Sequence, residues 1–316
     1  MRWSYIKSGD RVEVGQWCVR VPREQGEERR RSLLAAGDLD TSLKIRREGN
    51  EILLPVLGPV AGATRSLFEK GAEQQELPRH ELVGGIAIMQ ERDGKGAHIL
   101  LASRPNLHTV LFPTSEVSGE YRTRSFKVLA GEDTTRTRVT EYGHTFVVDL
   151  AAAYFSARLA TERQRLPGLM QDGERVLDMF AGVGPFAITL APKARLVMAC
   201  DLNPGAILLM RENIRINRSR TVLPVLADAG RLPDLAVGTF DRIVMNLPLA
   251  APSFLPIAFS LIRPGGTIHL YALVSEEGEF LPAIEACGPA GVQERFVRSY
   301  SPAQWHAVYD IVPGEI

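Results

Sequence analysis

The sequence predicts an α/β protein, with a doubly wound, mainly parallel sheet in the C-terminal half and smaller α+β domains before it. Two observations predict this fold class. From residue 174 onward, apolar runs alternate with helical stretches at the spacing of βαβ units, which build parallel sheets. Before that point the strand-like runs are short and are separated by glycine-bearing or charged turns, which is typical of antiparallel sheets.

Residues 1–60 are predicted to form a small α+β module. Residues 26–37 are typical of a helix that ends at glycine, and residues 43–56 are typical of a β-hairpin that turns at Gly49 and Asn50. Residues 61–79 have weak periodicity, so we interpret them as a linker with one helical piece.

Residues 80–166 are predicted to form a second α+β domain, and residues 167–316 the doubly wound domain. In the first, an antiparallel sheet is expected from the runs 86–88, 98–101, 109–112 and 146–149, and a helix from residues 151–166. In the second, parallel strands are expected at 175–179, 195–201, 222–226, 240–245 and 266–271.

The composition excludes several classes of protein. The 316 residues are 45% hydrophobic and 23% charged, which excludes a disordered or fibrous chain. No apolar run approaches 18 residues and the N-terminus lacks a signal-peptide pattern, so we expect a cytoplasmic protein with no membrane partner. The 37 basic residues balance the 37 acidic ones, so only local arginine clusters can argue for RNA binding. The three cysteines lie far apart, so neither a disulfide framework nor a metal site is expected.

The most informative motif runs from residue 176 to residue 186. An apolar strand ends in Asp178, a loop with Gly182 and Gly184 follows, and a helix begins after it. Such a loop lets the backbone approach a dinucleotide or S-adenosylmethionine (AdoMet) closely. A carboxylate at the strand end would repel a pyrophosphate, whereas it suits the ammonium group of AdoMet. AdoMet is therefore the predicted cofactor.

Polar residues also follow the next three predicted strands. Asp201 ends the second strand, where a carboxylate can accept both ribose hydroxyls, and Asp228 follows the third, where it can face an adenine amino group. Each acid alone could equally be a helix N-cap, but three at successive strand ends favour a binding site. The fourth strand ends in Asn246-Leu247-Pro248, which alone is typical of a turn and can also offer a donor and acceptors to a planar base.

These motifs closely resemble those of the tRNA (guanine-37 N1) methyltransferases of the archaeal and eukaryotic type. The matching stretches are 115–124, 128–132, 154–163, 178–186, 201–204, 245–248 and 297–302. The resemblance covers about residues 108–312, and residues 25–57 resemble the small N-terminal tRNA-binding module of that family. Two positions depart from the family pattern, since Ala157 replaces a usual proline and Leu249 a frequent lysine.

The resemblance implies a class I, Rossmann-like AdoMet methyltransferase domain, preceded by small RNA-binding domains, that methylates N1 of guanosine 37 in the tRNA anticodon loop. It implies Glu162 as the general base for the N1 proton and Arg122 as the donor that stabilises charge on O6, which suits the charge flow of the reaction. Asn246 would orient the base, and the Pro248 backbone would contact its exocyclic amine. From the residues alone, Glu162 could instead form a surface pair with Arg165, and Arg122 could be a solvated strand residue.

The implied cofactor-binding residues are Asp178, Phe180, Gly182, Gly184, Pro185, Asp201, Leu202, Asp228 and Asn246. The implied tRNA contacts are Tyr154, Arg158, Arg163 and Arg124. The expected partner is tRNA alone, and a monomer is the default expectation because one chain holds both binding modules.

Four other functions stay open at this point. A related enzyme transfers the aminocarboxypropyl arm of AdoMet to a tricyclic wyosine precursor at the same tRNA position, and a dual-specificity enzyme also methylates that precursor. A noncatalytic RNA-binding module would be expected to have lost the AdoMet loop or Glu162, and this sequence keeps both. A methyltransferase acting on another RNA or on a protein amide would not explain the upstream stretches.

Overall fold

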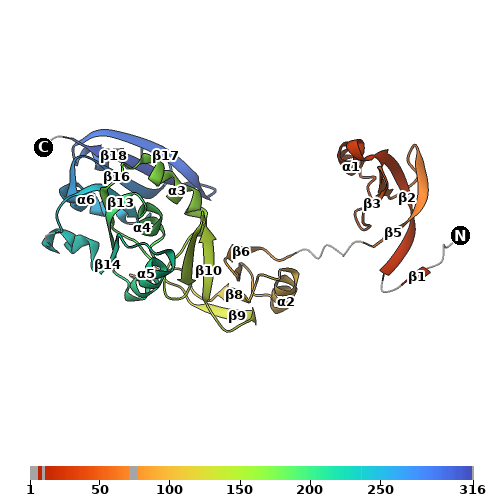
Figure 1. The fold of residues 1–316 in the computed structure, drawn as a ribbon, viewed down its shortest axis with the longest axis horizontal. Helices are drawn as coiled ribbons and strands as arrows, with labels where there is room; N and C mark the ends of the chain where they lie inside the picture. The colour runs from red at the N-terminus through yellow and green to blue at the C-terminus, as the bar shows by residue number, and fades with distance from the viewer. Residues whose placement is uncertain (1–5, 9–10, 71–76, 236, 315–316) are drawn as a thin grey trace. The chain divides into compact units, whose positions relative to one another are not determined.

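The computed structural model describes residues 6–8, 11–70, 77–235 and 237–314. The chain forms two compact units, Met1–Glu76 and Leu77–Ile316, which Figure 1 draws as ribbons. Each unit is described below by itself.

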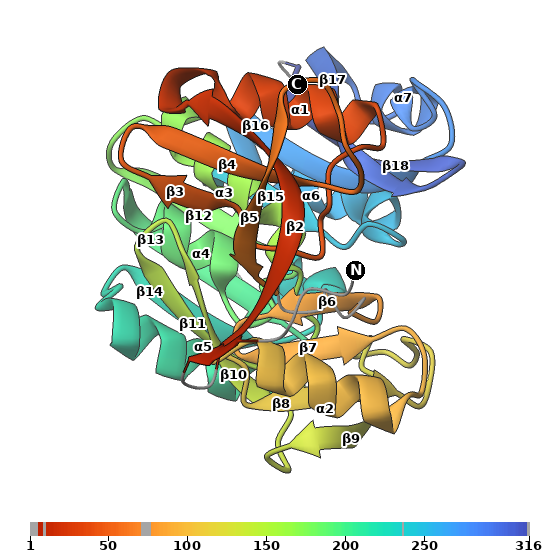
Figure 2. The same cartoon turned by 90° about the vertical axis from the view of Figure 1, so that its right-hand side faces the viewer.

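The first unit is a single antiparallel sheet with one helix, α1 (Gly26–Ala35), and a short η1 (Arg23–Gln25) before it. Its strands are β1 (Ile6–Ser8), β2 (Arg11–Pro22), β3 (Arg46–Glu48), β4 (Glu51–Val56) and β5 (Ala63–Glu69). The long β2 pairs with β1, β4 and β5, and Figure 2 shows this sheet from a second side. Leu33 of α1 packs with Val19 and Leu54 of the sheet. The predicted helix and the predicted turn at Gly49 and Asn50 are confirmed.

The predicted linker is wrong over its first half. Residues 63–69 form β5, which pairs with β2 in the register Val14↔Phe68, and neither β5 nor the rest of the described linker is helical. Phe68 is buried beside Cys18 and Leu53, so this segment belongs to the sheet. Residues 71–76 of the predicted linker lie outside the described residues.

The second unit begins with a four-stranded sheet in the order β6-β7-β8-β9. The strands are β6 (His80–Val83), β7 (Ile86–Met89), β8 (Thr109–Pro113) and β9 (Phe126–Gly131), and α2 (Gly94–Ser103) lies between β7 and β8 in the chain. The strand predicted at 98–101 is wrong because it lies within α2, which Asp93 caps and whose Ala97 and Leu100 are buried. Since a helix connects them, β7 and β8 pair in parallel, and the sheet is mixed instead of antiparallel.

The helix predicted at 151–166 starts later than expected. Residues 157–169 form η2 (Ala157–Leu159), α3 (Ala160–Arg165) and η3 (Leu166–Leu169), and the six residues before them are not helical. The Asn203 amide group donates to the Ala152 carbonyl oxygen at 2.7 Å, which occupies an acceptor that a helix would have used. This bond ties the segment to the start of α5.

The doubly wound sheet is confirmed. Its seven strands are β12 (Glu174–Asp178), β13 (Ala194–Asp201), β14 (Val222–Leu226), β15 (Phe240–Asn246), β16 (Ile262–Val274), β17 (Pro289–Ser301) and β18 (Gln304–Pro313). The spatial order is β14-β13-β12-β15-β16-β18-β17, in which the first five strands are parallel and β18 is antiparallel to both neighbours. The hairpin of β17 and β18 was not predicted. The intervening helices are α4 (Pro185–Leu190), α5 (Pro204–Asn217), η4 (Ala229–Leu235), η5 (Ala251–Phe254), α6 (Leu255–Leu261) and α7 (Leu281–Glu285).

The two-stranded sheet of β10 (Arg136–Glu141) and β11 (His144–Asp149) joins the upstream region to this domain. Phe146 of β11 shares a buried core with Val183 and Ala206 of the doubly wound domain. Asn213 of α5 completes the connection, because its side chain accepts from the Val147 amide at 2.7 Å and donates to the Val147 and Val183 carbonyl oxygens at 3.0 Å. The domain boundary predicted between residues 166 and 167 stays a prediction, because Leu77–Ile316 form one compact unit.

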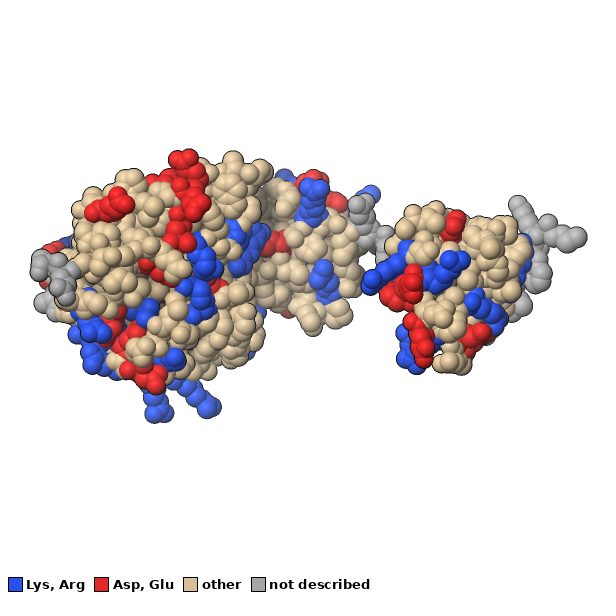
Figure 3. All heavy atoms as spheres, turned by 90° about the horizontal axis from the view of Figure 1, so that it is seen from above, with Lys and Arg blue, Asp and Glu red and all other residues tan. Residues whose placement is uncertain are grey.

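No helix in the described ranges is long and apolar enough to cross a membrane. On the face drawn in Figure 3, blue Lys and Arg side chains are interspersed with red Asp and Glu side chains on both units, as the balanced charge leads us to expect.

Candidate active site

A cleft of about 740 Å³ opens at the carboxyl ends of the parallel strands in the second unit. Open parallel sheets bind ligands at this edge. Twelve of the predicted site residues line the cleft: Arg122, Arg124, Tyr154, Arg163, Phe180, Gly182, Pro185, Asp201, Leu202, Asp228, Asn246 and Pro248. Four others, Arg158, Glu162, Asp178 and Gly184, are not among its lining residues.

The cofactor loop has the backbone that its glycines predict. Gly182 and Gly184 have φ angles of 55° and 89°, in the left-handed region that favours glycine. A Cβ at Gly184 would lie 2.8 Å from Cγ of Met210, so a side chain there would force the Met210 side chain of α5 to shift. Pro185 then starts α4, and Phe180 packs edge-on against Phe254 with ring centroids 5.1 Å apart. The loop is therefore fixed close to the strand ends.

Asp178 is a fully buried carboxylate at the end of β12. Neither oxygen completes a hydrogen bond with another described residue, although the nearby Phe180 and Ala187 amides offset part of the cost of its charge. Burial, and then the charge of Asp201, raise the pKa of Asp178 to about 7. A buried carboxylate without partners is rare in a folded protein and fits a cationic group of a ligand.

Asp201 and Asp228 differ in their surroundings. Asp201 accepts from the Gly182 amide at 2.6 Å and from the Asn203 amide at 2.8 Å, and burial raises its pKa. It is not the N-cap of α5, since Asn203 takes that role by accepting from the Gly205 amide at 2.8 Å. Each Asp201 oxygen retains acceptor capacity for a hydroxyl group. Asp228 is exposed and accepts from the Gly230 amide at 2.8 Å, a bond that is typical of a turn. Its exposed side chain can also contact a ligand.

The segment from Asn246 to Pro248 forms the wall next to β15. The Asn246 Oδ1 atom is buried and has no hydrogen-bond partner among the described residues. The Pro248 carbonyl oxygen already accepts from the Leu273 amide at 3.1 Å, so it offers a ligand its second lone pair only. Both residues line the cleft.

Arg122 lies at the mouth of the cleft in a strained turn. Its φ angle is 53°, which is unusual for a residue with a side chain and is typical of functional positions. Its guanidinium lies 5.5 Å from the ring centroid of Tyr154, and that of Arg124 lies 5.0 Å from Phe126. An arginine beside an exposed aromatic ring suits an unstacked nucleobase. Arg158 lies apart from this group and pairs with Glu81 at 3.0 Å.

Arg163 lines the cleft but is only 2% exposed. Its guanidinium donates to both Glu141 oxygens, at 2.9 and 2.7 Å, and to the Ser156 carbonyl oxygen at 3.0 Å. Burial lowers the pKa of Arg163, and the Glu141 charge opposes this shift. This arrangement favours a structural role, and the predicted contact of Arg163 with tRNA stays a prediction.

Glu162 lies beneath the cleft and is 4% exposed. Its carboxylate accepts from the Tyr271 hydroxyl at 2.9 Å, from Arg165 Nε at 2.8 Å and from Arg295 Nη2. The pairing with Arg165 thus exists, but it is buried. The sequence did not indicate Tyr271 or Arg295, because strands β16 and β17 bring them to Glu162 from more than 100 residues away.

A chain of partly buried ion pairs continues from Glu162 to β18. Arg165 also donates to Asp310 at 2.7 Å, and His269 Nδ1 lies 2.5 Å from the same carboxylate. Burial alone would raise the pKa of Asp310, but the hydrogen bonds from His269 and Arg165 lower it well below its usual range. The network fixes α3 against the last strand, β18.

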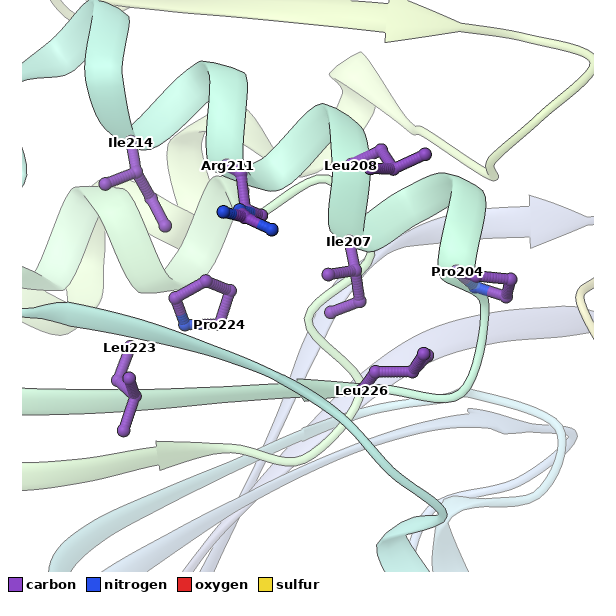
Figure 4. A pocket seen from close by; sticks show the side chains of 8 residues that line it. All are labelled: Pro204, Ile207, Leu208, Arg211, Ile214, Leu223, Pro224 and Leu226. Carbon is purple, nitrogen blue, oxygen red and sulfur yellow. The ribbon is translucent and has the colours of Figure 1, made fainter.

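A second hollow, of about 710 Å³, lies between α5 and β14 (Figure 4). Its lining is apolar except for Arg211: Pro204, Ile207, Leu208, Ile214, Leu223, Pro224 and Leu226. It lacks the convergent polar groups of a catalytic site, so we assign the candidate active site to the cleft.

Comparison with known proteins places this geometry in a context. Residues 137–288 match the family described as TRM5/TYW2 methyltransferase domain, and residues 18–64 match the tRNA methyltransferase 5 N-terminal domain. The tRNA (guanine(37)-N(1))-methyltransferase Trm5b of Pyrococcus abyssi is 40% identical over 93% of this chain and 98% of its own length.

Two further relatives are named for 4-demethylwyosine at position 37 of tRNA. The tRNA(Phe) (4-demethylwyosine(37)-C(7)) aminocarboxypropyltransferase of Methanocaldococcus jannaschii is 31% identical over 73% of this chain and 96% of its own length. The tRNA 4-demethylwyosine(37)-methyltransferase Taw21 of Saccharolobus solfataricus is 32% identical over 78% of this chain and 98% of its own length.

Solved structures of the same group share the fold. The crystal structure of Trm5b from P. abyssi has a TM-score of 0.73 and 36% identity, and covers 94% of this chain and 99% of that one. The complex of aTrm5 and tRNALeu has a TM-score of 0.72 and 29% identity over 94% and 99% of the two chains. M. jannaschii TYW2 in complex with AdoMet has a TM-score of 0.57 and 27% identity over 74% and 98%.

Proposed function

This chain belongs to the Trm5 family of tRNA (guanine-37 N1) methyltransferases, and from that premise we propose how its own residues perform the reaction. The protein is an AdoMet-dependent enzyme that transfers a methyl group to N1 of guanosine 37 in tRNA. The observation that carries the residue-level proposal is the convergence, in one cleft, of the cofactor loop, the Asn246 to Pro248 wall and Arg122.

The residues on the loop side fit AdoMet. AdoMet supplies a methyl group on a sulfonium, which is already activated for transfer. The Asp178 carboxylate, which has no hydrogen-bond partner among the described residues, suits the ammonium group. Asp201 suits the ribose hydroxyls, and Asp228, after the end of β14, suits the adenine amino group. Phe180, Pro185 and Leu202 would line the same part of the cleft, and Gly182 and Gly184 would keep it open.

The residues on the opposite side fit a guanine. Removal of the N1 proton builds negative charge on O6, and the Arg122 guanidinium can stabilise that charge. The free Oδ1 of Asn246 and the second lone pair of the Pro248 carbonyl oxygen can accept from N–H groups of the base. Tyr154 is available to stack on a base that has left the anticodon-loop stack. Alignment of the two reactants is the main contribution of such a cleft.

Glu162 is our candidate for the general base. Two guanidinium groups and the Tyr271 hydroxyl hold its carboxylate in place. To reach a base in the cleft, Glu162 must leave the pairing with Arg295 when tRNA binds. Catalytic hydrogen bonds often form only in the substrate complex, so this geometry is compatible with the role.

The N-terminal unit favours guanosine 37 over the wyosine precursor as the substrate. Residues 18–64 match the N-terminal domain of the guanosine methyltransferases, whereas the two relatives named for the precursor leave about a quarter of this chain unmatched. We also propose that the protein acts as a monomer in the cytoplasm. Arg158 and Arg124 are proposed as further tRNA contacts.

Transfer of labelled methyl from AdoMet to an unmodified tRNA transcript tests the proposal. We expect N1-methylguanosine with guanosine at position 37, none with adenosine there, and a sharply reduced yield for Glu162→Gln. Incorporation of the labelled carboxyl arm of AdoMet into wyosine-precursor tRNA, without methyl transfer, would instead identify an aminocarboxypropyltransferase.

A further inference from the structure

One buried histidine in the cleft has no part in the function described so far. His306 lies on β18, is 3% exposed and lines the cleft. Its neighbours across the sheet are Leu273 on β16 and Arg298 on β17, which line the cleft as well. His306 is therefore on the side of the cleft next to Pro248, away from the acids of the cofactor loop.

Two nitrogen atoms on this wall are buried and unpartnered. The His306 Nε2 atom has no hydrogen-bond partner among the described residues, and neither has Arg298 Nε on the paired strand. An unsatisfied buried polar group costs about 1 to 3 kcal/mol, so folded proteins retain few of them. Together with Asn246 Oδ1, these are three such atoms on residues that line one cleft, where a polar ligand can complete their hydrogen bonds.

The surroundings of His306 keep its imidazole neutral. Burial, and then the charge of Arg298, lower its pKa to about 4, against the opposing effect of the Glu162 carboxylate. A neutral imidazole can accept a hydrogen bond from an N–H group, which an imidazolium cannot. At neutral pH the residue is thus an uncharged hydrogen-bonding group that adds no positive charge beside a sulfonium cofactor.

His306 also lies next to the group that holds the candidate base. Its ring packs edge-on against Tyr271, with centroids 6.0 Å apart, and the Tyr271 hydroxyl donates to Glu162 at 2.9 Å. The imidazole is therefore in contact with the ring whose hydroxyl holds the carboxylate that the proposed function requires.

We propose that His306 is a further substrate-contacting residue, whose Nε2 atom forms a hydrogen bond to the edge of the target guanine and thereby sets N1 in line with the methyl group. Arg298 positions it and favours its accepting form. This inference rests on the proposed function, because it needs a guanine in the cleft, and it adds a residue of the C-terminal hairpin to the substrate site.

Three substitutions in the full chain separate a hydrogen bond at Nε2 from a packing role. His306→Gln places an amide near the position of Nε2, His306→Asn near that of Nδ1, and His306→Phe keeps only the ring. His98→Asn, at an exposed position of α2, is the matched control. The readouts are the single-turnover rate of methyl transfer to a tRNA transcript with guanosine at position 37, the AdoMet dissociation constant and the melting temperature.

We expect the rate to fall about tenfold or more for His306→Asn and His306→Phe, as for loss of one buried hydrogen bond, and to recover at least partly in His306→Gln. AdoMet affinity should stay within about twofold, because no cofactor contact changes. Equal rates for all variants, or rates that fall in step with the melting temperature and without rescue by Gln, would overturn the inference alone. Absence of methyl transfer by the unsubstituted chain would overturn the proposed function, and this inference with it.

Discussion

Replacement of Asp178 by asparagine should stabilise the folded protein while it weakens cofactor binding. The Asp178 carboxyl is fully buried, and its pKa rises from 3.8 to about 7 on folding. A carboxyl with a raised pKa holds more protons when folded than when unfolded, so it lowers the free energy of unfolding as the pH rises from 3.8 to 7. At 1.36 kcal/mol per pKa unit, the full cost of the buried charge is about 4 kcal/mol above pH 7.

The variant Asp178→Asn removes the charge and leaves a buried amide, whose own unmet hydrogen bonds cost about 1 to 3 kcal/mol at every pH. The diagnostic quantity is therefore the pH dependence. The difference in unfolding free energy between the variant and the unsubstituted protein should grow by about 2 to 3 kcal/mol from pH 5 to pH 8. Denaturant unfolding of the cofactor-free protein measures this difference, and Asp172→Asn on the surface is the control.

Cofactor binding should change in the opposite direction. Loss of the contact between carboxylate and ammonium should weaken AdoMet binding about 10- to 100-fold at pH 8, because charge-assisted hydrogen bonds contribute about 1.5 to 3 kcal/mol. In the unsubstituted protein the AdoMet affinity should fall as the pH drops from 8 to 6, and in the variant that fall should disappear. An asparagine variant with the same pH-dependent stability as the unsubstituted chain, or with undiminished AdoMet affinity, would refute the assignment.

Three further predictions follow from the site and the units. Glu162→Gln should lower the single-turnover rate about 100-fold with unchanged AdoMet affinity, as expected for loss of a general base, and a rate near that of the unsubstituted enzyme would exclude that role. Arg163→Ala should cost about 3 to 5 kcal/mol in denaturant unfolding, because it leaves the buried Glu141 without its partner, whereas Arg158→Ala in an exposed pair should cost less than about 1 kcal/mol. Deletion of Met1–Glu76 should weaken tRNA binding in a filter assay and leave AdoMet binding intact, and equal loss of both would contradict a tRNA-binding role for this unit.

The cofactor half of the site was predictable because its signals are local in the sequence. Asp178, the two loop glycines and the helix start lie within a few residues of one another, and a parallel sheet brings Asp201 to the same edge. Single-sequence patterns failed where tertiary contacts decide. Residues 98–101 have the composition of a strand but lie in α2, and residues 63–69 pair with the distant β2.

The residues that the C-terminal hairpin adds to the substrate side of the cleft could not be predicted from local patterns, because antiparallel pairing brings them there. The strand β18 inserts between β16 and β17, and this order brings residues near 270, 298 and 306 together with Glu162 of α3. No spacing in the sequence indicates that arrangement.

The same pairing explains why the sheet is extended beyond its parallel strands. Asp178, Asp201 and Asp228 lie at or just after the ends of β12, β13 and β14, on one side of the sheet centre. Those strands alone therefore provide no opposite wall for the transferred methyl group. The hairpin of β17 and β18 supplies that wall, with His306 and Arg298 in the cleft and with Arg295 on the candidate base. In the proposed function, a methyl donor on one side and a base on the other would meet at the ends of β12 and β15, where Asn246 ends its strand. Under that proposal the hairpin contributes to the substrate site as well as to the fold.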